Sequence, residues 1–127
     1  MRAVNLGGVE VSAQGSPWAL FLYQREFSTP DQKCSWYSDY DEARAEFEPT
    51  GDEQADVIKA VGGMDPLFCL KTLWACAKCA DDAVPGFESW MQSLDGVSMS
   101  PYAPWKLEVM ALINAEVFRY QAQDEEQ

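Results

Sequence analysis

The sequence predicts an α+β fold that is mostly α, with five to six helices and a small N-terminal β-hairpin. Two short alternating runs flank Gly7-Gly8, which is typical of a tight hairpin turn. A capping residue followed by proline occurs at Ser16-Pro17 and again at Asp65-Pro66, and this pairing marks the start of a helix. Apolar residues then recur at helical spacing in the segments that follow.

The length of the chain bounds the number of domains. It has 127 residues, 47% of them hydrophobic, which is enough for one core and too little for two. We therefore expect a single domain over 1–127. Within it we expect the hairpin over 1–14, a helical body over 16–120 and a polar tail over 121–127 that frays.

The hairpin strands are expected over Arg2–Leu6 and Val9–Ser12, and they must pack on the helices because a lone hairpin is marginal in water. The first helix is expected to begin at Pro17 and to end before Ser28-Thr29-Pro30. Four of its residues occupy positions i, i+3, i+4 and i+7, which predicts an amphipathic helix with an aromatic face. These residues are Trp18, Phe21, Leu22 and Arg25.

The stretch Gln32–Thr50 is ambiguous, and Asp41–Phe47 within it is compatible with a short helix before Pro49. Clearer start and stop signals predict the later helices, which run over Glu53–Val61, Pro66–Ala80, Gly86–Leu94 and Trp105–Tyr120. Asp52 or Thr50 is expected to cap the first of these, and Gly62-Gly63 to end it.

The formal net charge is −12, from 21 acidic and 9 basic residues. Nucleic acids and anionic membranes attract positive surfaces, so we expect no direct binding to either. The sequence shows no signal-peptide core and no run of about 18 apolar residues, so we expect a cytoplasmic protein with reduced cysteines. It contains no histidine, which removes the commonest general base and a common metal ligand. We expect no catalytic residue and no cofactor.

Cys76-Ala77-Lys78-Cys79 has the spacing of a redox or metal motif. A redox dithiol usually lies at the start of a helix, where the dipole lowers the thiol pKa, whereas this pair lies near the end of one. Cys69, Cys76 and Cys79 share one side of one helix, which is an unusual geometry for zinc. We expect inert thiols and no metal site, and we keep a thiol or metal protein built on these cysteines as an alternative.

The aromatic content is the main positive signal for binding. Five Trp, six Phe and five Tyr exceed what one small core usually needs, and Trp and Tyr concentrate binding energy at interfaces. These aromatic residues allow two interpretations. Either most of them belong to the core, or some of them form an exposed patch that binds a partner. The candidates for a protein interface are, in order, Phe87, Trp90 and Met91, then Trp18 and Phe21, then Trp105.

Three segments carry a family resemblance: Tyr23–Phe27, Trp74–Lys78 and Phe87–Trp90. They resemble the end of the first helix and the signature region of small phage tail assembly chaperones. The order of elements, a hairpin followed by helices, is also similar, and the resemblance covers about Val4–Phe118. The cysteines in the second segment and the Trp- and Tyr-rich stretch around Lys33–Tyr40 depart from the family pattern.

The resemblance implies a non-enzymatic protein that binds the tape measure protein of a long-tailed phage or prophage and helps recruit tail tube subunits. It also implies a location in the cytoplasm of the bacterial host and absence from the mature virion. Besides the thiol or metal protein, a second alternative is an acidic interaction or inhibitor protein, such as a DNA mimic or an anti-restriction factor. An exposed hairpin edge or aromatic face leaves a homo-oligomer open as well.

Overall fold

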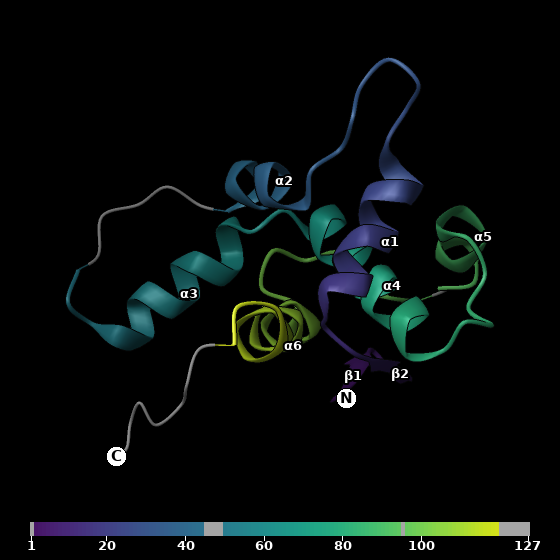
Figure 1. The fold of residues 1–127 in the computed structure, drawn as a ribbon. Helices are drawn as coiled ribbons and strands as arrows, with labels where there is room; N and C mark the ends of the chain where they lie inside the picture. Colours follow the sequence, from purple (N-terminus) through teal and green to yellow (C-terminus); the bar gives the residue numbers. More distant parts are fainter. Residues whose placement is uncertain (1, 45–49, 95, 120–127) are drawn as a thin grey trace.

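A computed structural model describes residues 2–44, 50–94 and 96–119 and shows the expected α+β fold, mostly α (Figure 1). Over these residues the chain forms an antiparallel hairpin, six α-helices and one π-helical segment, so the predicted fold class is confirmed. The elements are β1 (Arg2–Leu6), β2 (Val9–Ala13), α1 (Pro17–Phe27), α2 (Trp36–Ala43), α3 (Glu53–Gly63), α4 (Pro66–Ala80), α5 (Phe87–Gln92), α6 (Pro104–Leu112) and η1 (Ile113–Val117).

The hairpin follows the predicted register. Leu6 of β1 pairs with Val9 of β2, and Gly7 and Gly8 close the turn with φ values of 63° and 108°. Residues other than glycine rarely adopt such positive φ values, so the turn forms at this glycine pair. One face of the hairpin is buried against the helices and consists of Val4, Leu6 and Ala13.

Both predicted cap-and-proline signals start helices. The Oγ of Ser16 accepts a hydrogen bond from the backbone N–H of Ala19 at 3.4 Å, ahead of α1. A carboxylate oxygen of Asp65 accepts one from the N–H of Leu67 at 2.9 Å, ahead of α4. In each case the side chain satisfies a backbone donor that has no partner within the helix.

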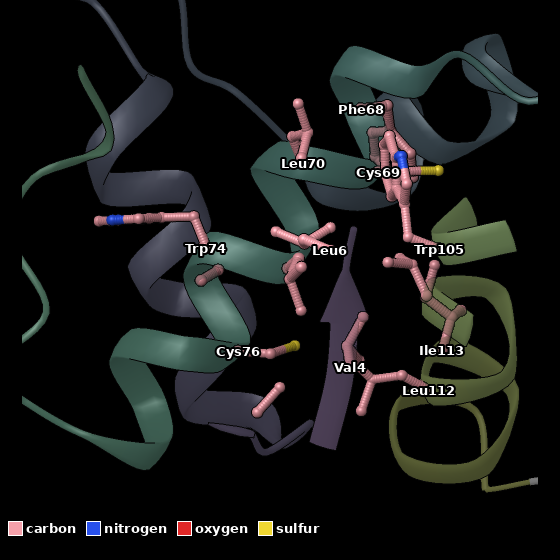
Figure 2. Close-up of a cluster of buried hydrophobic side chains, with 14 of the residues drawn as sticks. Val4, Leu6, Phe68, Cys69, Leu70, Trp74, Cys76, Trp105, Leu112 and Ile113 are labelled. Carbon is pink, nitrogen blue, oxygen red and sulfur yellow. The ribbon is translucent and has the colours of Figure 1, made fainter. Parts of the chain in front are cut away.

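Helix α4 lies at the centre of the fold. Every residue from Thr72 to Ala77 is buried, so no face of this part of the helix meets solvent. Helix α1, strand β2 and helix α6 pack against it, and α5 packs beside Trp74. Figure 2 shows Val4 and Leu6 of β1 between the side chains of α4 and those of α6. The hairpin is therefore one wall of the core, as an isolated hairpin requires.

Two buried polar side chains belong to this core, Thr72 and Lys106. The Oγ1 of Thr72 accepts a hydrogen bond from the indole N–H of Trp36 at 2.9 Å. The Nζ of Lys106 donates to the backbone oxygen of Pro101 at 2.8 Å. Burial disfavours the charged form of the lysine and lowers the pKa of Lys106 below its ordinary value.

The helix expected over Asp41–Phe47 lies earlier in the chain, because α2 spans Trp36–Ala43, while residues 45–49 lie outside the described ranges. The hydroxyl of Ser35 caps its first turn, and Trp36 is buried at its first position. The Trp- and Tyr-rich stretch around Lys33–Tyr40, which departs from the family pattern, therefore anchors α2 to α4 through Trp36.

The helix expected over Trp105–Tyr120 also differs. Helix α6 ends at Leu112 and continues as η1, in which the N–H of Phe118 bonds to the oxygen of Ile113 at 2.9 Å. Glu116 in this wider turn lies beside the connection between β2 and α1, where its carboxylate accepts the N–H of Gly15 at 2.7 Å. Arg119 then leaves the helix with φ of 57°, and Tyr120 lies outside the described residues.

Thr72→Val removes the acceptor of the Trp36 indole while keeping the shape of the side chain. We expect it to lower the free energy of unfolding by about 1–3 kcal/mol, because a buried donor is left without a partner. Thr72→Ser keeps the hydroxyl and is the matched control. Urea denaturation followed by tryptophan fluorescence measures both, and a loss in the valine variant no larger than that in the serine variant would contradict this role of the hydroxyl.

Gly15→Ala tests the contact between the β2–α1 connection and η1. A Cβ at Gly15 would lie 2.8 Å from the Cβ of Glu116 and 3.2 Å from its carbonyl carbon, so backbone must move. We expect a loss of about 1–3 kcal/mol in the free energy of unfolding. Gly62→Ala is the comparison: its Cβ would meet the ring of Tyr102, which is 62% exposed and able to rotate away. A larger loss for Gly62→Ala than for Gly15→Ala would refute the packing argument.

Candidate functional site

The three segments that carry the family resemblance meet where α1, α4 and α5 pack together. The ring of Phe27 lies 5.8 Å from that of Trp74 and 4.9 Å from that of Phe87, both edge-on. Phe87 is also 6.2 Å from Trp74 and 6.3 Å from Trp90. Edge-on and tilted contacts at such distances are favourable for aromatic pairs, so these rings form one packed cluster.

Hydrogen bonds tie the same three elements together. The indole N–H of Trp74 donates to the oxygen of Pro85 at 2.8 Å, and the Nζ of Lys78 donates to the oxygen of Val84 at 2.6 Å. The N–H of Phe87 donates to a carboxylate oxygen of Glu26 at 3.2 Å. These three hydrogen bonds fix the connection between α4 and α5 and hold α5 against the end of α1.

This packing corrects the first choice of interface residues. Trp90 is only 7% exposed, and Phe87 and Met91 are half-buried against the core, so they form no exposed patch. Trp105 is 2% exposed, and its indole N–H donates to the oxygen of Ser98 at 2.7 Å. Helix α5 has six residues, too few to be stable alone, and it therefore uses its apolar face to attach itself to the protein.

Trp18 and Phe21 are exposed, as an interface requires. Their side chains are 53% and 48% exposed, and the two rings stack with centroids 5.2 Å apart. The guanidinium carbon of Arg25 lies 5.6 Å from the centre of the Phe21 ring. These three residues form a stripe one to two turns long on the outer side of α1, which we call the α1 stripe.

The α1 stripe also shows where the predicted face of this helix was wrong. Leu22, which the sequence pattern placed on the aromatic face, is buried together with Ala19 and Tyr23. The core-facing side of α1 therefore follows Ala19, Tyr23 and Phe27, four residues apart, and leaves Trp18 and Phe21 outside. The sequence signal for this core-facing side was the small side chain of Ala19, since it allows α1 to approach α4 closely.

A second exposed apolar surface lies on α3 and was not expected. Val57 and Ile58 are 43% and 55% exposed and line a hollow of about 400 Å³ together with Glu53 and Gln54. We call these four residues the α3 strip. Their signal in the sequence is the spacing of Val57 and Ile58 from Val61, which puts all three on one helix face.

A polar pocket lies between α1, α2 and α4. Asp39 receives hydrogen bonds from the hydroxyl of Tyr23 at 2.6 Å and from the thiol of Cys34 at 3.2 Å. Two adjoining pockets of about 280 and 450 Å³ share Asp39, Glu42 and Lys71 in their walls. Burial and the bond to Asp39 raise the pKa of Tyr23, and they raise that of Cys34 to about 11. Both groups keep their protons at neutral pH, which makes them weak nucleophiles.

The cysteines of α4 are buried or half-buried free thiols. Burial raises the pKa of Cys69 and of Cys76 to about 12. Cys79 is half-buried, with its Sγ 3.2 Å from the Oγ of Ser16. Over the ranges 2–44, 50–94 and 96–119, no group of three or more Cys, Asp or Glu side chains is arranged to hold a metal ion. Within the same ranges, no helix is long and apolar enough to cross a membrane.

Comparisons with protein-family models, with curated proteins and with solved structures find no match for this chain.

Alkylation tests the state of the cysteines. We expect Cys69 and Cys76 to resist iodoacetamide in the folded protein at neutral pH and to react once the protein unfolds, because the thiolate is the reactive form and their pKa lies at about 12. Mass spectrometry of the digested protein locates the modified residues, and the half-buried Cys79 serves as an internal reference. Rapid alkylation of Cys76 in the folded protein, or stoichiometric zinc in the purified protein, would revive a thiol or metal function.

Proposed function

We propose that the protein is a phage tail assembly chaperone, a non-enzymatic binding protein of the bacterial cytoplasm that is absent from the mature virion. Its partners on this proposal are the tape measure protein and the tail tube protein. The observation that carries the proposal is the meeting of the three family-like segments in one junction of α1, α4 and α5. The residues that carry the resemblance therefore act together as one structural unit.

The α1 stripe is the surface we assign to the tape measure protein. Stacked aromatic rings that are half exposed offer a large apolar area at low cost in side-chain entropy, and such residues dominate binding energies. Arg25 beside Phe21 adds a charged edge to this apolar centre. A stripe of three residues favours moderate affinity, which suits a chaperone that tail tube subunits must later displace.

The acidic surface supports the same function. A net charge of −12 keeps the protein soluble and disfavours contact with nucleic acid, including packaged phage DNA. It also restricts stable association to partners whose surfaces carry complementary charge.

The decisive experiment is a pull-down of the purified tape measure and tail tube proteins encoded by the same phage. We expect Trp18→Ala/Phe21→Ala to weaken capture of the tape measure protein by about tenfold or more, since both changes remove interface aromatic rings. Tyr37→Ala/Leu107→Ala is the matched control, because it removes two similarly exposed side chains from α2 and α6. Circular dichroism verifies that both variants stay folded.

Two outcomes would overturn the proposal. Failure of the wild-type protein to capture either tail protein removes the chaperone function. Capture of a DNA-processing enzyme that DNA competes away would favour an acidic inhibitor instead. Equal loss in the two double variants would leave the chaperone function standing and move its interface away from the α1 stripe.

A further inference from the structure

Helix α3 buries too little of itself to account for its own stability. It has eleven residues, and Val61 is the one that is buried. Isolated helices shorter than about 12–15 residues are marginal in water, and β-branched residues and glycine lower helix propensity further. Val57 and Ile58 are β-branched, and Gly62 and Gly63, which were expected to end the helix after Val61, form its last two residues, with Met64 as the C-cap. The cap supplied by Asp52 compensates for only part of this deficit.

The apolar face of α3 runs outward from the core. Val57 and Ile58 precede Val61 by one helical turn, so they continue the face that Val61 buries. Figure 1 shows α3 at the edge of the molecule, with its first turn far from α4. Residues of α3 alone line the hollow beside Val57 and Ile58, so no other element of the described chain covers these two side chains.

Acidic residues lie at the start of α3, next to this strip. Glu53 lines the hollow, and Asp52 and Asp56 lie on the same first turn and a half. The carboxylate of Asp56 accepts the N–H and the hydroxyl of Thr50 at 2.9 and 3.0 Å. These bonds lower the pKa of Asp56, so it is ionised at neutral pH. Lys59 offsets one of the three acids, which leaves this end of α3 negative.

We propose that the α3 strip docks an amphipathic helix of another protein, one whose apolar face fills the hollow and whose flanks carry Lys or Arg. An apolar face laid into a hydrophobic groove is a common mode of helix recognition. The acids next to the strip attract the basic flanks and speed association. A second copy of this chain fits less well, because it would bring acid against acid at a net charge of −12 per chain.

The bound helix supplies the packing that α3 lacks, so binding and ordering of α3 are coupled. This inference does not rest on the tail assembly function, because it concerns a different helix and a different surface from the α1 stripe.

The test uses a synthetic peptide of about 20 residues, long enough to be helical, with leucines on one face and lysines on both flanks. We expect the full-length protein to bind it about tenfold or more tightly than the same peptide with glutamates on the flanks. Val57→Gln/Ile58→Gln is expected to weaken binding by about tenfold or more, and glutamine preserves helix propensity at both positions. Trp18→Ala/Phe21→Ala is the control and is expected to bind like the wild type.

Hydrogen exchange supplies a second measurement, in which the amides of α3 gain protection when the lysine peptide is added. Equal binding of the two peptides, or unchanged binding by Val57→Gln/Ile58→Gln, would overturn the proposal. A dimer seen by sedimentation without peptide and abolished by the same variant would overturn it in favour of a second copy. Loss of binding in the control variant alone would assign the peptide to the α1 stripe.

Discussion

Helix α4 is apolar around its whole circumference from Thr72 to Ala77, and such a helix must be covered on every side. The other elements are arranged to do this. Helix α1 covers one side, the hairpin and α6 cover others, and α5 covers the side on which Trp74 lies. None of these covers is stable alone, because a two-stranded hairpin and a six-residue helix are both marginal in water. The fold is therefore held by contacts to one central helix.

Burying α4 also buries polar groups, and each of these needs a partner. The indoles of Trp36 and Trp74 donate to Thr72 and to Pro85, and the ammonium of Lys106 donates to Pro101. These bonds cross between elements that lie far apart in the sequence or join a helix to the loop beside it. The Trp36 bond joins α2 to α4, and the Trp74 bond holds the loop before α5 on α4. The Lys106 bond stays between α6 and the loop before it. Each bond avoids an unpaired buried donor, which would be costly.

Elements that are marked by local sequence signals could be predicted. Features that depend on packing against elements distant in the sequence could not. The glycine turn and the Ser16 and Asp65 caps act over a few residues, so the hairpin and the starts of α1 and α4 were predicted correctly. The core-facing side of α1 was not, because Trp18 and Phe21 match helical spacing as well as Tyr23 and Phe27 do. Only the approach of α4 to Ala19 decides between them. The π-helical turn likewise involves a segment distant in the sequence, because Glu116 within it accepts the N–H of Gly15.

The same distinction explains why the most recognisable residues are not the exposed ones. Trp74, Phe87 and Trp90 lie in the segments on which the proposed family assignment rests, and their side chains join α4, α5 and α1. A signature of this kind reports a shared way of packing, and it does not by itself report a shared partner. Partner choice must come from side chains that the core does not need. On the described chain, the exposed side chains outside the core include the stacked Trp18 and Phe21 and the outward face of α3.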